Sequence, residues 1–226
     1  MSSAAASLQT LVAVRAGDLL TQLRAEAGLD AEGALDRTAF AAVFAGAGRR
    51  LGTAPLGAGA EISDDDGDRW SIAGWGLDEA GRALLLLTAI ACVPTDDQVE
   101  WVEECYREGA LRERQAILRT LAALPMPGRF LGIALDASRV SIQPIFEAIA
   151  CDNPYPARYF PDSSFNQLAL KAVFTELPLA RIVDLEQRLT PELARMADDY
   201  ASERRAAGRS VPADLIHLTK PKPRAS

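Results

Sequence analysis

Apolar residues recur at helical spacing along almost the whole chain, and this pattern limits the fold more than any other feature. Such stripes cover residues 8–27 and 38–50, and further helices are expected at about 77–92, 95–108, 111–124, 127–135, 138–150, 162–176 and 190–207. Alanine and leucine dominate, whereas β-branched and aromatic residues, which favour strands, are sparse. The sequence therefore predicts an all-α fold.

The links between the expected helices are short, and several carry a proline, as at Pro94, Pro125 and Pro127. Successive short amphipathic helices joined by brief turns are typical of an irregular α-α superhelix, that is, a HEAT-like helical array. No internal sequence repeat is visible, and such a repeat is the usual signature of an array. A compact helical bundle is therefore the alternative architecture.

At 226 residues the chain is long enough to bury a sizeable core. We expect a single helical domain over residues 1–215. One long irregular connection, at about residues 52–76, is rich in glycine and contains the acidic cluster 64–68. Residues 216–226 are rich in lysine and proline, and we expect them to form a disordered tail.

Charge and cysteine content limit the location and the class of partner. The net charge of −7 argues against nucleic-acid binding, which needs a basic face. Three widely spaced cysteines indicate free thiols in a reducing compartment. The most apolar run, residues 83–93, is far shorter than the ~20 residues of a membrane helix. We therefore expect a cytoplasmic protein.

The sequence offers little for catalysis or metal binding. The one histidine, His217, lies near the C-terminus, which excludes a two-histidine metal site and makes a Ser–His or Cys–His pair improbable. Asp64, Asp66 and Asp68 mimic the start of a calcium loop, but the twelfth position is Trp75, which has no carboxylate. We expect no metal, no cofactor and no catalytic residue.

The run 152–171 is the densest in chemistry. Aromatic, charged and amide side chains are mixed there between plain helices, which a simple connecting turn does not require. Because Asn153 and Tyr155 each precede a proline, we expect extended backbone that displays the Tyr and Arg side chains. Arg158 offers a planar fork suited to a carboxylate or a phosphate. The segment is thus interpreted as a recognition surface.

The helix that follows this run adds polar groups to it. If the helix begins at Asp162 or Ser163, its free backbone N–H groups are available to bind an anion there. Gln167 and Lys171 are four residues apart and share one face, with Asn166 beside them. The alternative is structural: these groups hydrogen-bond the run to neighbouring helices, for instance Arg158 to the row of Asp199 and Glu203 on the last helix.

Helix ends are also marked. Ser164 and Gln167 have the spacing of a capping box, and Asp162 or Ser163 is the alternative N-cap. Thr190 and Pro191 predict the cap and the first residue of the last helix, and Gly208 predicts its end.

Two stretches, residues 153–174 and 193–212, resemble the EboA-domain family. Residues 51–56 and 75–87 look similar too, so the likeness spans about residues 40–215. The specific part is Tyr159-Phe-Pro-Asp together with Phe165-Asn-Gln. The chain positions that match the family in these stretches are Asn153, Arg158, Tyr159, Asp162, Asn166, Gln167, Lys171, Asp199, Tyr200, Glu203 and Arg204.

The resemblance implies a cytoplasmic accessory protein, encoded beside a UbiA-like membrane prenyltransferase and several metabolic enzymes. The family is associated with metabolite traffic, the movement of a biosynthetic product or precursor towards export. It carries no catalytic motif that transfers to this chain. The matching positions above are our candidate ligand-binding residues.

Three hypotheses for the function follow. We favour a non-catalytic module that binds a small metabolite, or partner enzymes of the same gene cluster, through residues 152–171 and the last helix. The second is an enzyme acting on a polar cyclitol- or sugar-phosphate-like intermediate, in which Arg158 and Lys171 hold the anion and Asp199 or Glu203 with Tyr159 transfers protons. The third is a protein scaffold that docks through residues 70–75.

Overall fold

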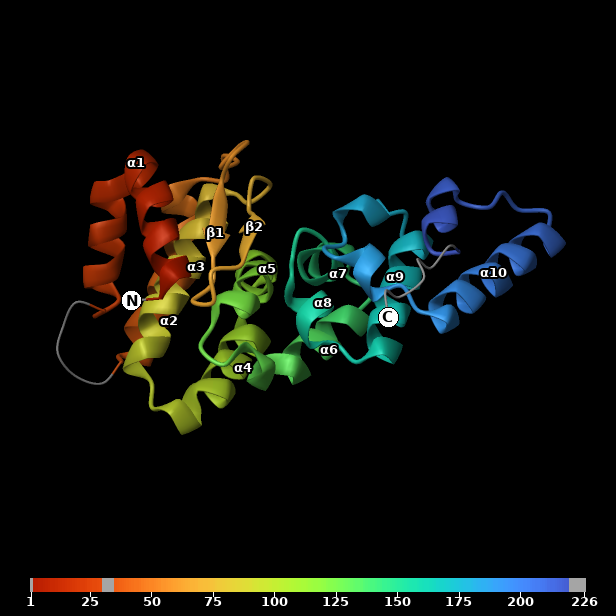
Figure 1. Cartoon of the computed structure of the whole chain (residues 1–226). Helices are drawn as coiled ribbons and strands as arrows, with labels where there is room; N and C mark the ends of the chain where they lie inside the picture. Colours follow the sequence, from red (N-terminus) through yellow and green to blue (C-terminus); the bar gives the residue numbers. More distant parts are fainter. Residues whose placement is uncertain (1, 30–34, 220–226) are drawn as a thin grey trace. The chain divides into compact units, whose positions relative to one another are not determined.

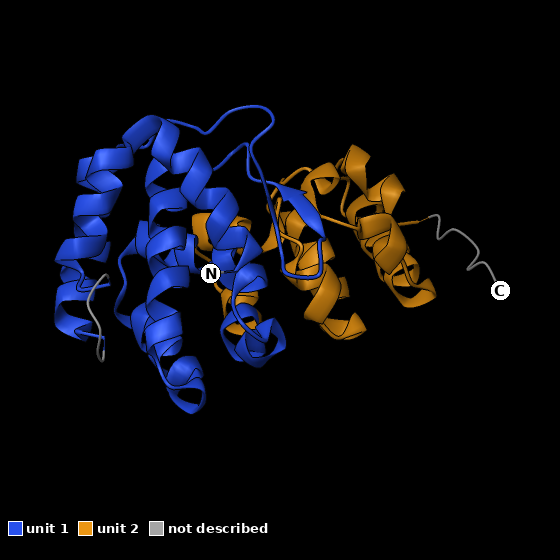
Figure 2. Cartoon of the chain, turned by 60° about the vertical axis from the view of Figure 1, so that its left-hand side comes forward, with its two compact units in different colours: residues 1–134 blue, residues 135–226 orange. Residues whose placement is uncertain are grey.

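The computed structural model describes residues 2–29 and 35–219, which divide into two compact units (Figure 2). The N-terminal unit is Met1–Ala134 and the C-terminal unit is Leu135–Ser226. The prediction of one helical domain over residues 1–215 stays a prediction. Each unit is described by itself below.

Helices dominate both units among the described residues, which confirms the all-α class (Figure 1). The choice between a superhelix and a bundle stays a prediction. The α-helices are α1 (Ser3–Glu26), α2 (Arg37–Leu51), α3 (Leu77–Ala89), α4 (Gln98–Glu108), α5 (Leu111–Thr120), α6 (Leu131–Arg139), α7 (Gln143–Ala150), α8 (Tyr155–Tyr159), α9 (Asp162–Phe174) and α10 (Pro191–Ala206). Short 3-10 helices join them: η1 (Ile90–Cys92), η2 (Thr95–Asp97), η3 (Leu121–Ala123), η4 (Pro127–Phe130), η5 (Leu179–Arg181), η6 (Leu185–Arg188) and η7 (Ala213–His217).

The N-terminal unit is built around α3, which contacts α1, α2 and α5. Its leucines, from Leu84 to Leu87, are all buried, as the apolar run in the sequence predicts for a central helix. Gly81 is the point of closest approach to α2, because a Cβ atom built there meets the Leu51 Cδ1 atom at 2.3 Å. A side chain at this position would require the Leu51 side chain to move.

The first turn of α3 buries an ion-pair cluster. Asp78 is fully buried and accepts from Arg82 Nη1 at 2.8 Å and from Arg112 Nη2 at 2.6 Å. Glu79 accepts from Arg119 Nη1 at 2.8 Å and from the Gly76 backbone N–H at 2.7 Å. Buried carboxylates are tolerated because each has these partners.

The connection predicted as irregular at residues 52–76 contains an antiparallel hairpin. Strands β1 (Glu61–Ser63) and β2 (Arg69–Ser71) pair with Ile62 opposite Trp70, and both of these side chains are buried. Gly67, with φ of 91°, allows the turn between the strands. The strands have three residues each, too few for a clear alternating pattern in the sequence.

In the C-terminal unit, α9 contacts α7, α10, η5 and η6. Phe146, Phe165 and Leu193 are fully buried and represent α7, α9 and α10 in the core. The helix ends predicted for α10 are confirmed, since Thr190 Oγ1 accepts from the Leu193 N–H at 3.0 Å and Gly208 adopts φ of 67° just past the helix. The predicted capping box of Ser164 and Gln167 is wrong, because α9 begins earlier, at Asp162 after Pro161.

The predicted disordered tail, residues 216–226, begins inside η7, and Leu218 is fully buried. Residues 220–226 of that tail lie outside the described residues. Within the described part of the chain, none of the helices combines the length and the apolar character needed to cross a membrane. Within the described residues, Cys92, Cys105 and Cys151 form no disulfide bond.

Candidate functional site

Tyr155, which we expected in extended backbone before Pro156, is the first residue of α8, so the prediction is wrong at Tyr155, whereas Asn153 precedes the helix. Asn153 is buried, its Nδ2 donates to the Ala148 carbonyl at 3.0 Å, and its Oδ1 accepts from the Tyr155 N–H at 3.0 Å. The Asn153 side chain therefore caps the first turn. Pro156 falls in that turn, where a residue without an N–H group breaks no helical hydrogen bond.

Tyr155, which we expected to be displayed, is fully buried. Its ring centroid lies 4.7 Å from that of Tyr159 and 6.5 Å from that of Phe160. Burial, with a smaller contribution from Tyr159, raises the pKa of Tyr155 above its ordinary value. Tyr155 and Phe160 thus form part of the core, and Tyr159 is half-buried.

Arg188, on η6, hydrogen-bonds to several groups of this run. The sequence analysis did not predict a role for it. Its guanidinium donates to the carbonyls of Pro156 at 3.2 Å, of Ala157, and of Phe160 at 2.7 Å. It also donates to Asp162 Oδ1 at 3.2 Å and lies 4.5 Å from the Phe165 ring centroid. One side chain thereby satisfies the C-terminal carbonyls of α8 and the start of α9.

Arg181, at the end of η5, ties the beginning of the run in the same way. Its Nε and Nη2 donate to Asp152 Oδ2 at 2.9 and 2.6 Å, and its Nη1 donates to Glu147 Oε1 at 2.5 Å. The Asp152 N–H donates back to the Arg181 carbonyl at 2.7 Å. Burial lowers the pKa of Arg181, but the hydrogen bonds to Asp152 and Glu147 outweigh this and raise it overall.

The predicted residues on α9 divide into buried and exposed ones. Asn166 is buried and donates to Thr190 Oγ1 at 3.3 Å. Lys171 donates to the carbonyls of Ser138 at 2.8 Å and Val140 at 2.6 Å, and burial lowers its pKa. Gln167 is exposed. Two of the three amide and amine groups therefore cap or cross-link neighbouring elements.

The predicted residues on α10 make contacts of their own. Asp199 accepts from Arg195 Nη1 at 2.8 Å on the exposed face of the helix. Arg204 donates to Tyr200 Oη at 3.1 Å and to the Ser210 carbonyl at 2.5 Å. Glu203 is exposed.

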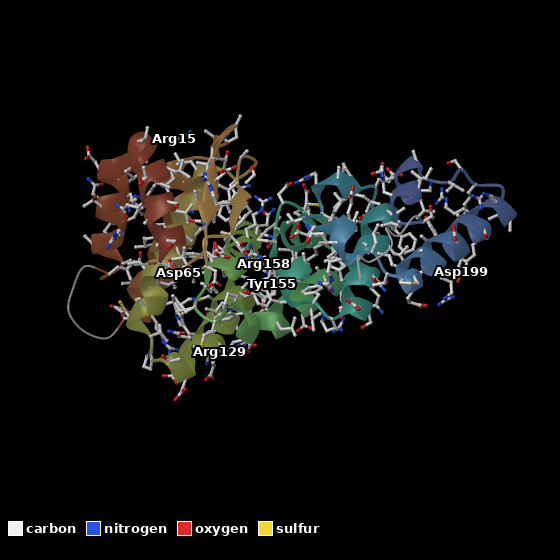
Figure 3. All side chains as sticks on the ribbon, viewed as in Figure 1. Arg15, Asp65, Arg129, Tyr155, Arg158 and Asp199 are labelled. Atoms are coloured by element: carbon white, nitrogen blue, oxygen red, sulfur yellow. The ribbon has the colours of Figure 1, made fainter. Side chains whose placement is uncertain are left out.

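Arg158, Lys171 and Asp199, the residues of the predicted anion site, do not lie close together. Arg158 lies on α8 and Asp199 well along α10, clearly apart in the C-terminal unit (Figure 3). The Lys171 ammonium faces the Ser138 and Val140 carbonyls at the C-terminal end of α6, and the Asp199 carboxylate faces Arg195. The convergent pocket of Arg158, Lys171 and Asp199 that the enzyme hypothesis requires is therefore absent from the described residues. Ligand binding by the eleven candidate residues stays a prediction.

A hollow of about 800 Å³ lies elsewhere in the C-terminal unit, on residues 179–189, to which the sequence analysis assigned no role, and on Ile216 and His217 of the predicted tail. We call it the aliphatic hollow, after its walls, which are Leu179, Ile182, Leu185, Leu189 and Ile216. His217, Asp184, Gln187 and Glu186 add polar groups to the lining. Ile216 is 57% exposed, so much of its side chain is in contact with solvent.

Residues 179–189 both line the aliphatic hollow and hydrogen-bond to residues 152–162. In residues 179–189, the arginines Arg181 and Arg188 bond to the run, while the apolar side chains between them line the hollow. The run therefore fixes the backbone that carries one wall of the hollow.

The comparison with protein families decides the identity. The model of the family described as "Metabolite traffic protein EboA" matches residues 14–220. The chain belongs to the EboA family. No curated protein and no solved structure matches it.

Within this EboA chain, the polar side chains of the resembling stretches are largely occupied by structural contacts. Sequence reasoning found Asn153 and Asn166 from their setting, and both hydrogen-bond neighbouring segments. It missed Arg181 and Arg188, whose partners are distant in sequence and which belong to no motif.

The scaffold hypothesis and metal binding involve residues outside these stretches. Trp70 is 6% exposed and Trp75 is 2% exposed, so neither indole is presented for docking, contrary to the scaffold hypothesis. Across residues 2–29 and 35–219, no three His, Cys, Asp or Glu side chains are grouped so that they could hold a metal ion.

Proposed function

We propose that this EboA-family chain is a non-catalytic metabolite carrier that binds a small, mainly apolar molecule in the aliphatic hollow. The observation that supports this is the hollow itself, whose volume of about 800 Å³ falls within the range of small-molecule pockets. Metabolite traffic, the role that the family description gives, requires such a reversible binding site.

The chemistry of the walls indicates the class of ligand. Leucine and isoleucine side chains supply apolar contact, and each Å² of apolar ligand surface removed from water contributes ~25 cal/mol. His217 and Asp184 are the polar groups able to orient one end of the ligand. The Asp184 carboxylate already accepts from Gln187 Nε2 at 3.1 Å, so His217 is the better contact for a polar end group.

The binding wall depends on the run that characterises the family resemblance. Arg188 and Arg181 tie residues 179–189 to that run through carbonyl and carboxylate groups. A rigid wall favours binding because less conformational entropy is lost when the ligand is ordered. Of the predicted ligand-binding residues, Asp162 acts in this proposal by supporting the hollow, through its bond to Arg188.

The proposed carrier must also transfer its metabolite to another protein. We place the protein in the cytoplasm, with transfer to partner proteins of the same gene cluster, including a membrane prenyltransferase. The exposed candidates Gln167 and Glu203 are available as polar contacts for such a partner. Nucleic acid is not a partner in this proposal, because the net charge is −7.

Titration with the apolar fluorophore N-phenyl-1-naphthylamine tests the site. We expect saturable fluorescence enhancement for the wild type and binding at least about tenfold weaker for Ile216→Glu, because a carboxylate in the hollow must be desolvated when an apolar probe enters. Ile142→Glu is the matched control, since Ile142 is 47% exposed in the same unit and does not line the hollow. Equal binding by the two variants would refute the proposed site.

A further inference from the structure

The charged part of the lining of the aliphatic hollow is acidic, and this limits the polar end of a ligand. Asp184 and Glu186 line the hollow, and its described lining residues include no lysine or arginine. Asp184 is exposed, whereas Leu179, Ile182 and Leu185 are buried. An apolar ligand that contacts the buried side chains therefore leaves its polar end on the side of the carboxylates.

The two arginines of the same segment do not offset this negative charge. Arg181 is bonded to Asp152 and Glu147. Arg188 is bonded to Asp162 and to backbone carbonyls. Neither arginine lines the hollow. The cations of the segment are thus engaged elsewhere, while its carboxylates belong to the lining.

The surroundings of Asp184 make it the residue that can sense the end group. Its Oδ1 atom accepts from Gln187 Nε2 at 3.1 Å, and because the amide is neutral this bond leaves the negative charge in place. A ligand carboxylate beside Asp184 is a like charge, and neither group has a hydrogen to donate to the other. A hydroxyl group carries no charge and can donate to an imidazole or a carboxylate.

We propose that Asp184 makes the aliphatic hollow select apolar molecules that end in a hydroxyl group over those that end in a carboxylate or a phosphate. This inference rests on the carrier function proposed above, and it narrows the ligand to an apolar alcohol. Repulsion between two unit charges a few Å apart in water corresponds to about a fivefold change in affinity. Glu186 acts in the same direction, because it adds a second carboxylate to the lining.

Displacement of N-phenyl-1-naphthylamine tests this selection with ligands that share one chain and differ in the end group. The ligands are 1-decanol, decanoate and decyl phosphate, at about pH 8, where both acids are ionised. We expect 1-decanol to bind at least about fivefold more tightly than either anion. The difference should narrow at high salt, because charges near solvent are screened. Equal displacement by the three ligands would overturn the proposal.

Asp184→Asn separates the charge of this residue from its shape. Asparagine tolerates the φ of 54° found here, and its Oδ1 atom can still accept from Gln187, so we expect the backbone of η6 to be kept. Binding of the two anions should strengthen by about three- to fivefold, whereas binding of 1-decanol should change less than about twofold. An unchanged preference for the alcohol would refute the role of Asp184.

Asp198→Asn is the matched control. It makes the same change of charge at an exposed position of α10, in the same unit, and Asp198 does not line the hollow. Its preference for 1-decanol should match that of the wild type. An equal loss of preference in the two asparagine variants would show a general effect of net charge and would refute the assignment to the hollow.

The possible results distinguish this inference from the carrier proposal. If N-phenyl-1-naphthylamine does not bind, or binds Ile216→Glu and Ile142→Glu equally, the carrier proposal fails and the selection by Asp184 fails with it. If the probe binds in the hollow and the three ligands displace it equally, only the selection by Asp184 fails.

Discussion

The Arg188 guanidinium donates to the Phe160 carbonyl at 2.7 Å, and this bond joins residues 28 positions apart in the sequence. Through this arginine, the end of α8 is attached to the segment that carries the wall of the aliphatic hollow. The relationship explains why polar groups gather in the run 152–162 without forming an anion pocket.

The first prediction concerns this arginine. Arg188→Ala should lower the free energy of unfolding by about 3 kcal/mol, because several buried carbonyl groups lose a charged donor. It should also weaken N-phenyl-1-naphthylamine binding, because the wall is no longer held. Urea unfolding and probe titration measure the two effects.

Arg195→Ala is the control for that variant. Arg195 pairs with Glu192 and Asp199 on the exposed face of α10, where ion pairs contribute little. Its stability and probe binding should match the wild type. A loss in Arg195→Ala as large as that in Arg188→Ala would contradict the special position of Arg188.

The second prediction concerns the buried cluster on α3. Asp78→Asn should cost about 3 kcal/mol, because Arg82, whose side chain is 4% exposed, would keep its charge without a carboxylate partner. The measurement is thermal or urea unfolding. Glu61→Gln, which breaks the exposed pair with Arg69, should leave stability nearly unchanged.

The third prediction is the pH dependence of that cluster. Burial raises the pKa of Asp78, but Arg112 and Arg82 together outweigh burial and lower it below its ordinary value. A carboxylate with a lowered folded-state pKa stabilises the fold fully above the unfolded value, about 3.9, and loses this contribution as pH falls further. The stability difference between wild type and Asp78→Asn should therefore be constant from about pH 7 to 5 and shrink below about pH 4. Urea unfolding across this range checks it, and a difference independent of pH would contradict it.

The fourth prediction tests the contact between α2 and α3. Gly81→Ala should cost about 1–3 kcal/mol despite the better helix propensity of alanine, because its Cβ atom meets Leu51. Leu51→Ala removes the obstacle, so the double variant should be more stable than the sum of the single effects predicts. Additive effects in urea unfolding would show that the backbones have room to separate.

The sequence was sufficient for the fold class and for most helices, because apolar spacing reports which face of a helix is buried. Thr190 and Gly208 marked the ends of α10 correctly, since capping is a local property. The hairpin at Ile62 and Trp70 was not predicted, because strands of three residues carry little periodicity.

The site was less predictable. Tyr155 precedes a proline, which favours extended backbone, yet the Asn153 cap and burial of the ring outweigh that preference. The partners of Arg181 and Arg188 are distant in sequence, and no local pattern announces them. Polar residues that looked suited to a ligand are therefore engaged with the protein itself.

The most direct test of the carrier proposal is photolabelling with an apolar diazirine, 3-trifluoromethyl-3-phenyldiazirine, followed by peptide mapping in the presence and absence of N-phenyl-1-naphthylamine. The account predicts labels concentrated on residues 179–189 and on Ile216, which the competitor removes. Labels spread evenly over the chain, or concentrated on the surface of α8 and α9 and unaffected by the competitor, would contradict it.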